Sequence, residues 1–101
     1  MDCKITRNAA RMLLKELEQE EDKSLKLRVY VTHAHGNHAH YGLGVDTPGD
    51  DDVVIATDKG IDVILQKDEP LLDGVKIDYL YLPDEEGFVI TNPSRGNHGD
   101  H

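Results

Sequence analysis

Residues 25–45 read LKLRVYVTHAHGNHAHYGLGV and combine two alternating apolar patterns with a loop rich in histidine. Every second residue is apolar over residues 27–31, and the same period of two returns over residues 41–45. This period is typical of a strand with one buried face. Gly36 and Asn37 lie between the two patterns and suit a turn. The stretch therefore predicts two strands joined by a histidine-containing loop.

A helix is predicted ahead of this stretch, over residues 7–21, which read RNAARMLLKELEQEE. Its apolar side chains recur at helical spacing, which builds one apolar stripe along the helix. The stripe consists of Ala10, Leu13, Leu14 and Leu17. Thr6 precedes the helix, and its hydroxyl suits the capping position of the first turn.

Further strands and turns are predicted after residue 45. VVIAT and IDVIL form a hairpin around DKG, where Gly60 can adopt the positive φ of a tight turn. KDEPLLDG contains a short helical turn that ends at Gly74, and VKIDYLYL and FVIT supply two more strands. One helix followed by about six short strands predicts an α+β domain with a largely antiparallel sheet.

Length and composition limit the class of protein. The chain has 101 residues and a formal net charge of -9, so we expect residues 1–101 to form a single, strongly acidic domain. We expect residues 94–101 to be a mobile tail that contains histidine. The acidic surface argues against nucleic acid and membrane as partners. The single cysteine, Cys3, rules out an internal disulfide, and no apolar run reaches the roughly 18 residues of a membrane span. Because the N-terminus lacks the apolar stretch of a signal peptide, we expect a cytoplasmic protein.

A series of segments follows in order along nearly the whole chain: ITRNAARMLLKEL, LRVYV, YGLGVD, DDVVIATDKGIDVIL, LLDGVKIDYL and GFVITNPS. The last two contain the patterns Leu-x-Gly-x-x-x-Asp-Tyr and Gly-Phe-x-x-x-Asn-Pro. In this order and spacing they resemble the HesB/IscA-like family of A-type iron-sulfur cluster carriers. The resemblance implies a HesB-like α+β fold, in which an N-terminal helix packs on a compact, mostly antiparallel β structure. It also implies a carrier and not an enzyme, protein partners in cluster assembly or among cluster acceptors, and a homo-oligomer.

The chain departs from this family where the cluster ligands belong. Members that carry clusters have one cysteine in the loop after the first strand and a Cys-Gly-Cys near the C-terminus. In this sequence the loop cysteine corresponds to Gly36 or Asn37. The tail pair corresponds to Gly99 and His101, or to His98 and Asp100. Since clusters prefer thiolates and Cys3 lies at the opposite end of the chain, we do not expect ordinary iron-sulfur cluster binding.

Imidazoles stand where the family places thiolates. Residues two apart on a strand share a face, so His33 and His35 form one pair and His38 and His40 another. The turn between the pairs would bring them together, and the resemblance implies that the C-terminal motif, with Asp100, lies close by. Imidazole and carboxylate suit a divalent metal such as iron or zinc better than a sulfide cluster. The predicted metal ligands are His33, His35, His38, His40, His98 and His101.

Other interpretations of the histidines stay open. They can be solvated side chains with adventitious metal affinity, or groups that bind a partner or sense pH. The chain can also be an adaptor or regulatory module that kept the fold and lost metal and cluster binding. The pattern Thr-His-x-His-x-Asn-His resembles the metallo-β-lactamase signature, but Asn37 replaces the metal-binding aspartate, and the chain is too short for that two-sheet hydrolase. We therefore expect a protein that is not an enzyme.

Overall fold

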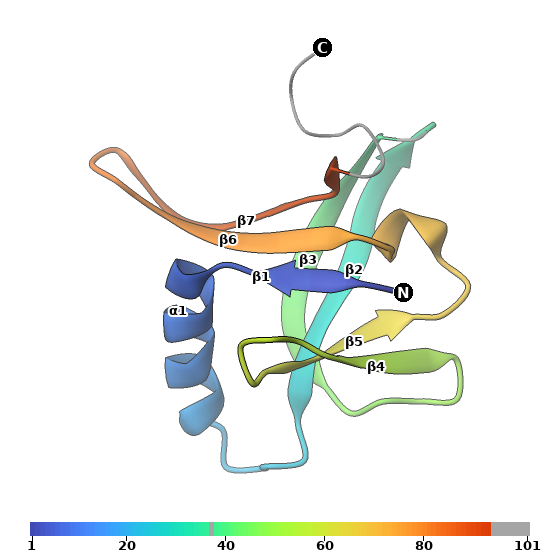
Figure 1. Ribbon diagram of the computed structural model, residues 1–101, viewed down its shortest axis with the longest axis horizontal. Helices are drawn as coiled ribbons and strands as arrows, with labels where there is room; N and C mark the ends of the chain where they lie inside the picture. The colour runs from blue at the N-terminus through green and yellow to red at the C-terminus, as the bar shows by residue number, and fades with distance from the viewer. Residues whose placement is uncertain (37, 94–101) are drawn as a thin grey trace.

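A computed structural model describes residues 1–36 and 38–93, with His38 described by its backbone alone. Within these ranges the chain forms one α-helix, one short 3-10 helix and seven strands (Figure 1). In chain order they are β1 (Cys3–Ile5), α1 (Arg7–Glu18), β2 (Lys26–His35), β3 (His38–Asp46), β4 (Asp52–Ala56), β5 (Asp62–Gln66), η1 (Pro70–Leu72), β6 (Val75–Leu82) and β7 (Glu85–Thr91). Neither helix in these ranges is long and apolar enough to cross a membrane. The predicted mobile tail lies outside the described residues.

The strands form two mixed sheets. The three-stranded sheet has the order β1-β6-β7, and the four-stranded sheet has the order β3-β2-β5-β4. β1 pairs with β6 in parallel and β2 pairs with β5 in parallel, whereas the other pairings are antiparallel. The predicted α+β class with a mostly antiparallel β structure is therefore confirmed.

One strand, β1, was not predicted from the sequence. β1 spans Cys3–Ile5, which is too short to show any period, and it exists because β6 offers a partner edge. The Gly74 N–H donates to the Asp2 carbonyl at 2.8 Å and closes the start of this pairing. The N-terminus is therefore part of a sheet and not a free end before the helix.

The core lies between the two sheets and beneath α1. Its buried side chains come from both sheets and from the helix, and they form one contiguous cluster. They include Ala9, Ala10, Leu13, Leu27, Val29, Val63, Leu65, Val75 and Ile77. Burial of apolar area of this kind is the main favourable term in folding.

The helix differs from its prediction in its end and in one core residue. α1 ends at Glu18, and the Gln19 N–H bonds back to the Glu16 carbonyl at 3.2 Å, so residues 19–21 are not helical. Several acidic side chains at the negative end of the helix dipole disfavour further helical turns. Leu14 was predicted to belong to the buried stripe, but it is 45% exposed because the packed face runs through Ala10 and Leu13.

The predicted capping role of Thr6 is confirmed, and it links the helix to a sheet. The Thr6 Oγ1 accepts from the Ala9 N–H at 3.3 Å and donates to an Asp78 carboxylate oxygen at 2.7 Å. The Thr6 N–H donates to the Ile77 carbonyl at 2.9 Å. This hydroxyl bond is the main reason that the Asp78 pKa lies below its usual value. The start of α1 is therefore tied to β6 by a charged acceptor.

Arg28 joins three strands on the side of the four-stranded sheet that faces away from the core. Its guanidinium donates to both carboxylate oxygens of Asp52 at 3.1 and 2.6 Å, and its Nε donates to Asp46 at 3.0 Å. Asp46 lies on β3 and Asp52 on β4, so one side chain from β2 reaches across β5. The bonds from Arg28 lower the pKa of Asp52. A bidentate contact of this kind also fixes the relative orientation of the guanidinium and the carboxylate.

The lowered pKa values of Asp52 and Asp78 predict an acid-sensitive fold. Because each folded pKa lies below the unfolded value of about 3.9, the stability that these carboxylates add is complete above that value and is lost as the pH falls through the folded pKa. Asp52→Asn should lower the free energy of unfolding by about 1 kcal/mol at pH 7. The difference from the parent protein should shrink between pH 4 and pH 2, as measured by urea denaturation at each pH.

Asp58→Asn is the matched control, because the Asp58 side chain is 80% exposed and its ion pair with Lys59 joins sequence neighbours. It should leave the urea midpoint unchanged across the same pH range. A loss in Asp52→Asn that stays constant down to pH 2 would contradict an electrostatic origin.

Candidate metal site on the β2–β3 hairpin

The histidines lie on strands and not in a loop. β2 and β3 pair from Lys26↔Asp46 as far as His35↔His38, so only residues 36 and 37 lie beyond the ladder. Gly36 has a φ of 58°, which glycine adopts at little cost, and this agrees with the predicted turn. The strands are thus longer than predicted, because the hairpin keeps pairing through the histidines.

The ladder contains one irregularity, at Thr32. Val31 pairs with Tyr41 and His33 pairs with His40, so Thr32 is an extra residue on β2. Such a bulge changes which side of the sheet the following residues occupy. Before Thr32, the odd-numbered residues of β2 face the core, as Leu27 and Val29 show by their burial.

After the bulge, the odd-numbered residues of β2 face away from the core. Opposite residues of an antiparallel pair share a face, and His40 precedes Tyr41, which packs against the core. Ala39 is only 5% exposed, so it occupies the inner side between two outward positions. We call the side away from the core the outer face, and it carries Arg28, Tyr30, His33, His35 and His40.

Tyr30 marks the same face next to the histidines. Its ring lies over Gly42, its cross-strand partner, and a Cβ on Gly42 would collide with that ring. The ring is 44% exposed. The outer face therefore continues from Tyr30 to the histidines as a surface open to solvent.

Two imidazoles converge on this face. The Nε2 atoms of His33 and His35 are 2.6 Å apart, and the rings meet edge to face with their centroids 4.3 Å apart. In a hydrogen bond between them, one Nε2 donates and the other accepts. The ring of His40 is 6.1 Å from that of His33, centroid to centroid. Two ring nitrogens therefore point at one place, with a third ring nearby.

The structure places three of the six predicted metal ligands on one face and brings two of them, His33 and His35, together. His33, His35 and His40 share the outer face, and the backbone register places His38 opposite His35. His98 and His101 lie outside the described residues, as does the His38 side chain. Among the side chains that the structure describes, no three from His, Cys, Asp and Glu lie close enough together to hold a metal. The arrangement in place is a converging pair, His33 and His35, with the ring of His40 on the same face.

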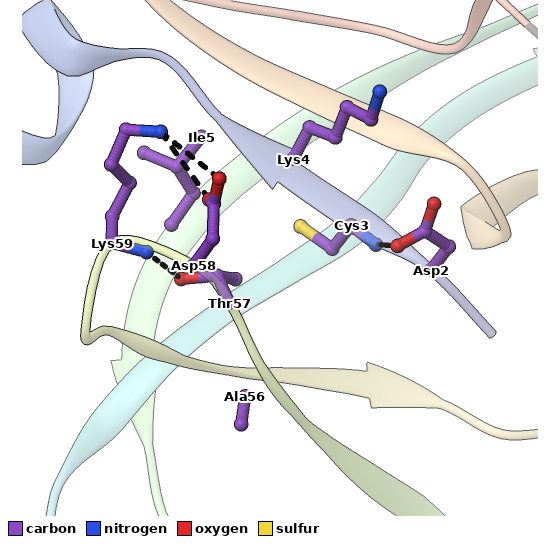
Figure 2. Close-up of a pocket in the computed structure, with 8 residues that line it drawn as sticks. All are labelled: Asp2, Cys3, Lys4, Ile5, Ala56, Thr57, Asp58 and Lys59. Atoms are coloured by element: carbon purple, nitrogen blue, oxygen red, sulfur yellow. Dashed lines mark hydrogen bonds and ion pairs between the residues drawn. The ribbon is translucent and has the colours of Figure 1, made fainter.

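Cys3 belongs to a different part of the molecule. It lies in β1, is 5% exposed, and lines a cavity of about 260 Å³ between β1 and the turn after β4 (Figure 2). Burial and the neighbouring Asp2 raise the pKa of its thiol to about 12. The thiol therefore stays protonated near neutral pH and is a poor metal ligand.

A second set of contacts fixes the end of β7 beside the hairpin. Asn92 is fully buried, and its side-chain amide donates to the carbonyls of Leu71 and Asp73 at 2.7 and 2.9 Å. The Tyr41 hydroxyl donates to the same Leu71 carbonyl at 2.7 Å. η1 is thus held between β3 and the end of β7, which lies near β3 in Figure 1. In the sequence, Asn92 stands out only as part of the Gly-Phe-x-x-x-Asn-Pro pattern, and nothing in its neighbours indicates these distant partners.

The chain is similar to curated iron-sulfur proteins, although no protein-family model matches it. "Iron-sulfur cluster insertion protein ErpA 2" of Methylococcus capsulatus is 34% identical over 95 residues, which cover 90% of this chain and 71% of the relative. "Iron-sulfur cluster insertion protein ErpA" of Colwellia psychrerythraea is 32% identical over 96 residues, covering 93% of this chain and 84% of the relative.

Two solved structures share the fold. Escherichia coli SufA, described as involved in the biosynthesis of iron-sulfur clusters, superposes with a TM-score of 0.71 at 20% identity, covering 92% of this chain and 87% of SufA. IscA with a [2Fe-2S] cluster gives a TM-score of 0.66 at 22% identity, covering 91% and 83%. The arrangement of one helix and two mixed sheets is therefore that of SufA and IscA.

The contacts of Asn92 predict a large loss of stability on truncation. Asn92→Ala should lower the free energy of unfolding by about 2 to 3 kcal/mol, because two carbonyls lose a buried donor. Tyr41→Phe removes one bond and should cost about 1 kcal/mol. Asn8→Ala, an exposed amide in the first turn of α1, is the control and should change little. Urea denaturation followed by circular dichroism measures all three, and equal losses in Asn92→Ala and Asn8→Ala would contradict this role.

Proposed function

This chain belongs to the HesB/IscA family of A-type iron-sulfur carriers, and we propose that it serves iron-sulfur cluster assembly by carrying a divalent metal on histidine. The metal, iron or zinc, is the cargo of this carrier. The observation that carries the proposal is the convergence of the His33 and His35 Nε2 atoms at 2.6 Å on an exposed strand face. The family relation supports a role in iron-sulfur cluster assembly, and the histidine pair supports a divalent metal as the cargo.

The residues present do not fit an iron-sulfur cluster. Clusters are held by several thiolates, and the chain has one cysteine. That cysteine is buried in β1, in the other sheet from the hairpin, with a raised pKa. In the turn after β2, the family resemblance places a cysteine at position 36 or 37, and this chain has Gly36 and Asn37 there. A cargo bound by imidazole nitrogen is therefore the better match to this chain.

The proposed ligands are His33, His35, His38, His40, His98 and His101. A metal bound by two imidazoles at about 2.0–2.1 Å needs their nitrogens about 3.3 Å apart. The Nε2 atoms of His33 and His35 would have to separate slightly, which exposed side chains can do. His98 follows Pro93 by five residues, a stretch that an extended chain can span over about 18 Å. Since Asn92 fixes the start of that stretch, the tail histidines have a short path to the hairpin.

An open, exposed site suits a carrier. Sites with unfilled coordination positions accept a further ligand, whereas closed tetrahedral sites hold their metal for structure. Three of the six candidate histidines suffice to hold an ion on the outer face, which would leave a position for a ligand from a partner protein. The partners in this proposal are assembly or acceptor proteins.

One observation favours a second candidate function, that of an adaptor without metal. Among the described side chains no three potential ligands lie close together. A formal net charge of -9 gives such an adaptor a surface for a basic partner protein. The two candidates differ in whether the purified chain binds metal with a defined stoichiometry.

Metal titration separates these candidates. Calorimetric titration with Zn²⁺, and with Fe²⁺ under anaerobic conditions, should show a saturable site with a fixed ratio of metal to chain. The double variant His33→Ala/His35→Ala should weaken binding by more than about 100-fold, since loss of a mere outer-shell partner already costs 10–100-fold. Tyr30→Phe is the matched control, because it lies on the same strand face and offers no imidazole. Weak, graded uptake that is equal in all three proteins would leave the adaptor as the better candidate.

Anaerobic reconstitution with iron and sulfide tests the exclusion of clusters. We expect no visible sulfide-to-iron charge-transfer bands in the purified chain, because it lacks the thiolates. Cys3→Ser should give the same spectrum, since Cys3 is buried. Bands of stoichiometric intensity that vanish in Cys3→Ser would show that the thiol is a ligand and would contradict the proposed cargo.

A further inference from the structure

The bulge at Thr32 decides on which side of the sheet the histidines lie. Side chains alternate between the two faces of a strand, and a shift of one residue moves a whole set to the other face. In the sequence, Leu27, Val29 and Val31 are followed at the same period by His33 and His35. An unbroken ladder would therefore turn these histidines toward the core. The extra residue at Thr32 reverses the alternation and turns them outward.

The inner side at this end of the hairpin is packed at some positions and open at Ala34, which is exposed. Ala39 is 5% exposed there, and Val31 and Tyr41 pack against the core. Burying a polar ring without a hydrogen-bond partner is unfavourable. On the outer side, the exposed Tyr30 ring lies on the same strand face as His33 and His35. The bulge thus separates the part of β2 before Thr32, which packs on the core, from the part after it, where His33 and His35 are exposed to solvent.

We propose that the Thr32 bulge is the positioning element of the metal site, so that the ion binds on the outer face beside Tyr30 and not between the sheets. This inference rests on the proposed function for its metal, but the orientation of the histidines does not. The role lies in the register: the bulge takes up the one residue by which β2 exceeds β3 between the pairs Val31–Tyr41 and His33–His40, and the threonine side chain takes no part in it. Thr32→Ala should therefore leave both the orientation and the metal affinity unchanged.

Two opposite changes of length test this role. Deletion of Thr32 removes the excess residue and the need for a bulge together. Val31 then directly precedes His33, the pairs Val31–Tyr41 and His33–His40 are kept, and ordinary alternation leaves the histidines outward. Zn²⁺ affinity should stay within about threefold of the parent. Insertion of one threonine between His40 and Tyr41 gives Thr32 a partner and also removes the bulge. In that variant both strands regain unbroken alternation, the histidines turn inward, and Zn²⁺ affinity should fall by about 100-fold or more.

Combining the deletion with the insertion provides the rescue. The extra residue then lies on β3, and the histidines should face outward again with recovered Zn²⁺ affinity. Nuclear Overhauser effects from the His33 ring, measured without metal, report the face directly. The parent, the deletion and the combined variant should show contacts to Tyr30, whereas the insertion should show contacts to Val31 or should unfold.

The outcomes distinguish this inference from the proposed function. An insertion variant that binds Zn²⁺ like the parent, or a combined variant as defective as the insertion, would overturn the role of the bulge. If the parent protein binds no metal but the ring contacts follow the expected pattern, the proposed function fails while the structural role of the bulge stands. Loss of metal affinity in Thr32→Ala would assign the effect to the side chain and also overturn the inference.

Discussion

The inner face of β2 sets the phase of the four-stranded sheet. Leu27 and Val29 are 2% and 0% exposed and pack in the core, so β2 cannot slip by one residue without exposing them. β2 pairs with β3 on one edge and with β5 on the other, and both registers follow from that anchor. Arg28 and Tyr30 must then face outward, where the guanidinium binds Asp46 and Asp52. The side on which the histidines lie depends on this anchor and on the bulge that takes up Thr32 in the pairing of β2 with β3.

Local patterns predicted much of the fold because local interactions carry it. The Thr6 cap, the turn at Gly60 and the strand over Val75–Leu82 each rest on a side chain or a backbone preference that is legible in a few residues. β1 was missed because its three residues form a strand only against β6. Leu14 was wrongly predicted to be buried because the apolar stripe of the helix is wider than the face that packs against the sheets. Which part of the stripe is buried depends on how the helix docks, and the sequence alone does not show this.

At the candidate site, too, features set by neighbouring residues were predicted and features set by distant contacts were not. The sequence pairs His33 with His35 and predicts a turn at Gly36, and both features are present. It does not reveal their face, because a bulge adds a residue without changing composition or period in any visible way. It also leaves the link from Asn92 to η1 unseen, since that link joins residues about twenty positions apart. Three of the six predicted ligands share the outer face, and all six remain predictions as metal ligands.

Several residues of the family motifs in this chain make contacts that stabilise the fold. Asp78 holds the Thr6 cap, Tyr41 and Asn92 hold η1, and none of these contacts involves a cluster ligand. A scaffold stabilised in this way can keep its shape while the donor atoms at its hairpin change from sulfur to nitrogen. Nitrogen donors change what is bound, because imidazole holds single divalent ions and lacks the preference of thiolate for iron bound to sulfide.

The strongly acidic surface bears on how such a carrier would meet its partners. A net charge of -9 raises the rate of encounter with basic proteins and opposes encounter with acidic ones, an effect that weakens with salt. The charge also raises the local concentration of divalent cations, which by itself gives weak and graded binding. A specific site must therefore compete with its own electrostatic background. In the proposed site, converging imidazoles would provide that competition, because nitrogen donors select a metal by bonding geometry, whereas a diffuse negative potential attracts all cations alike.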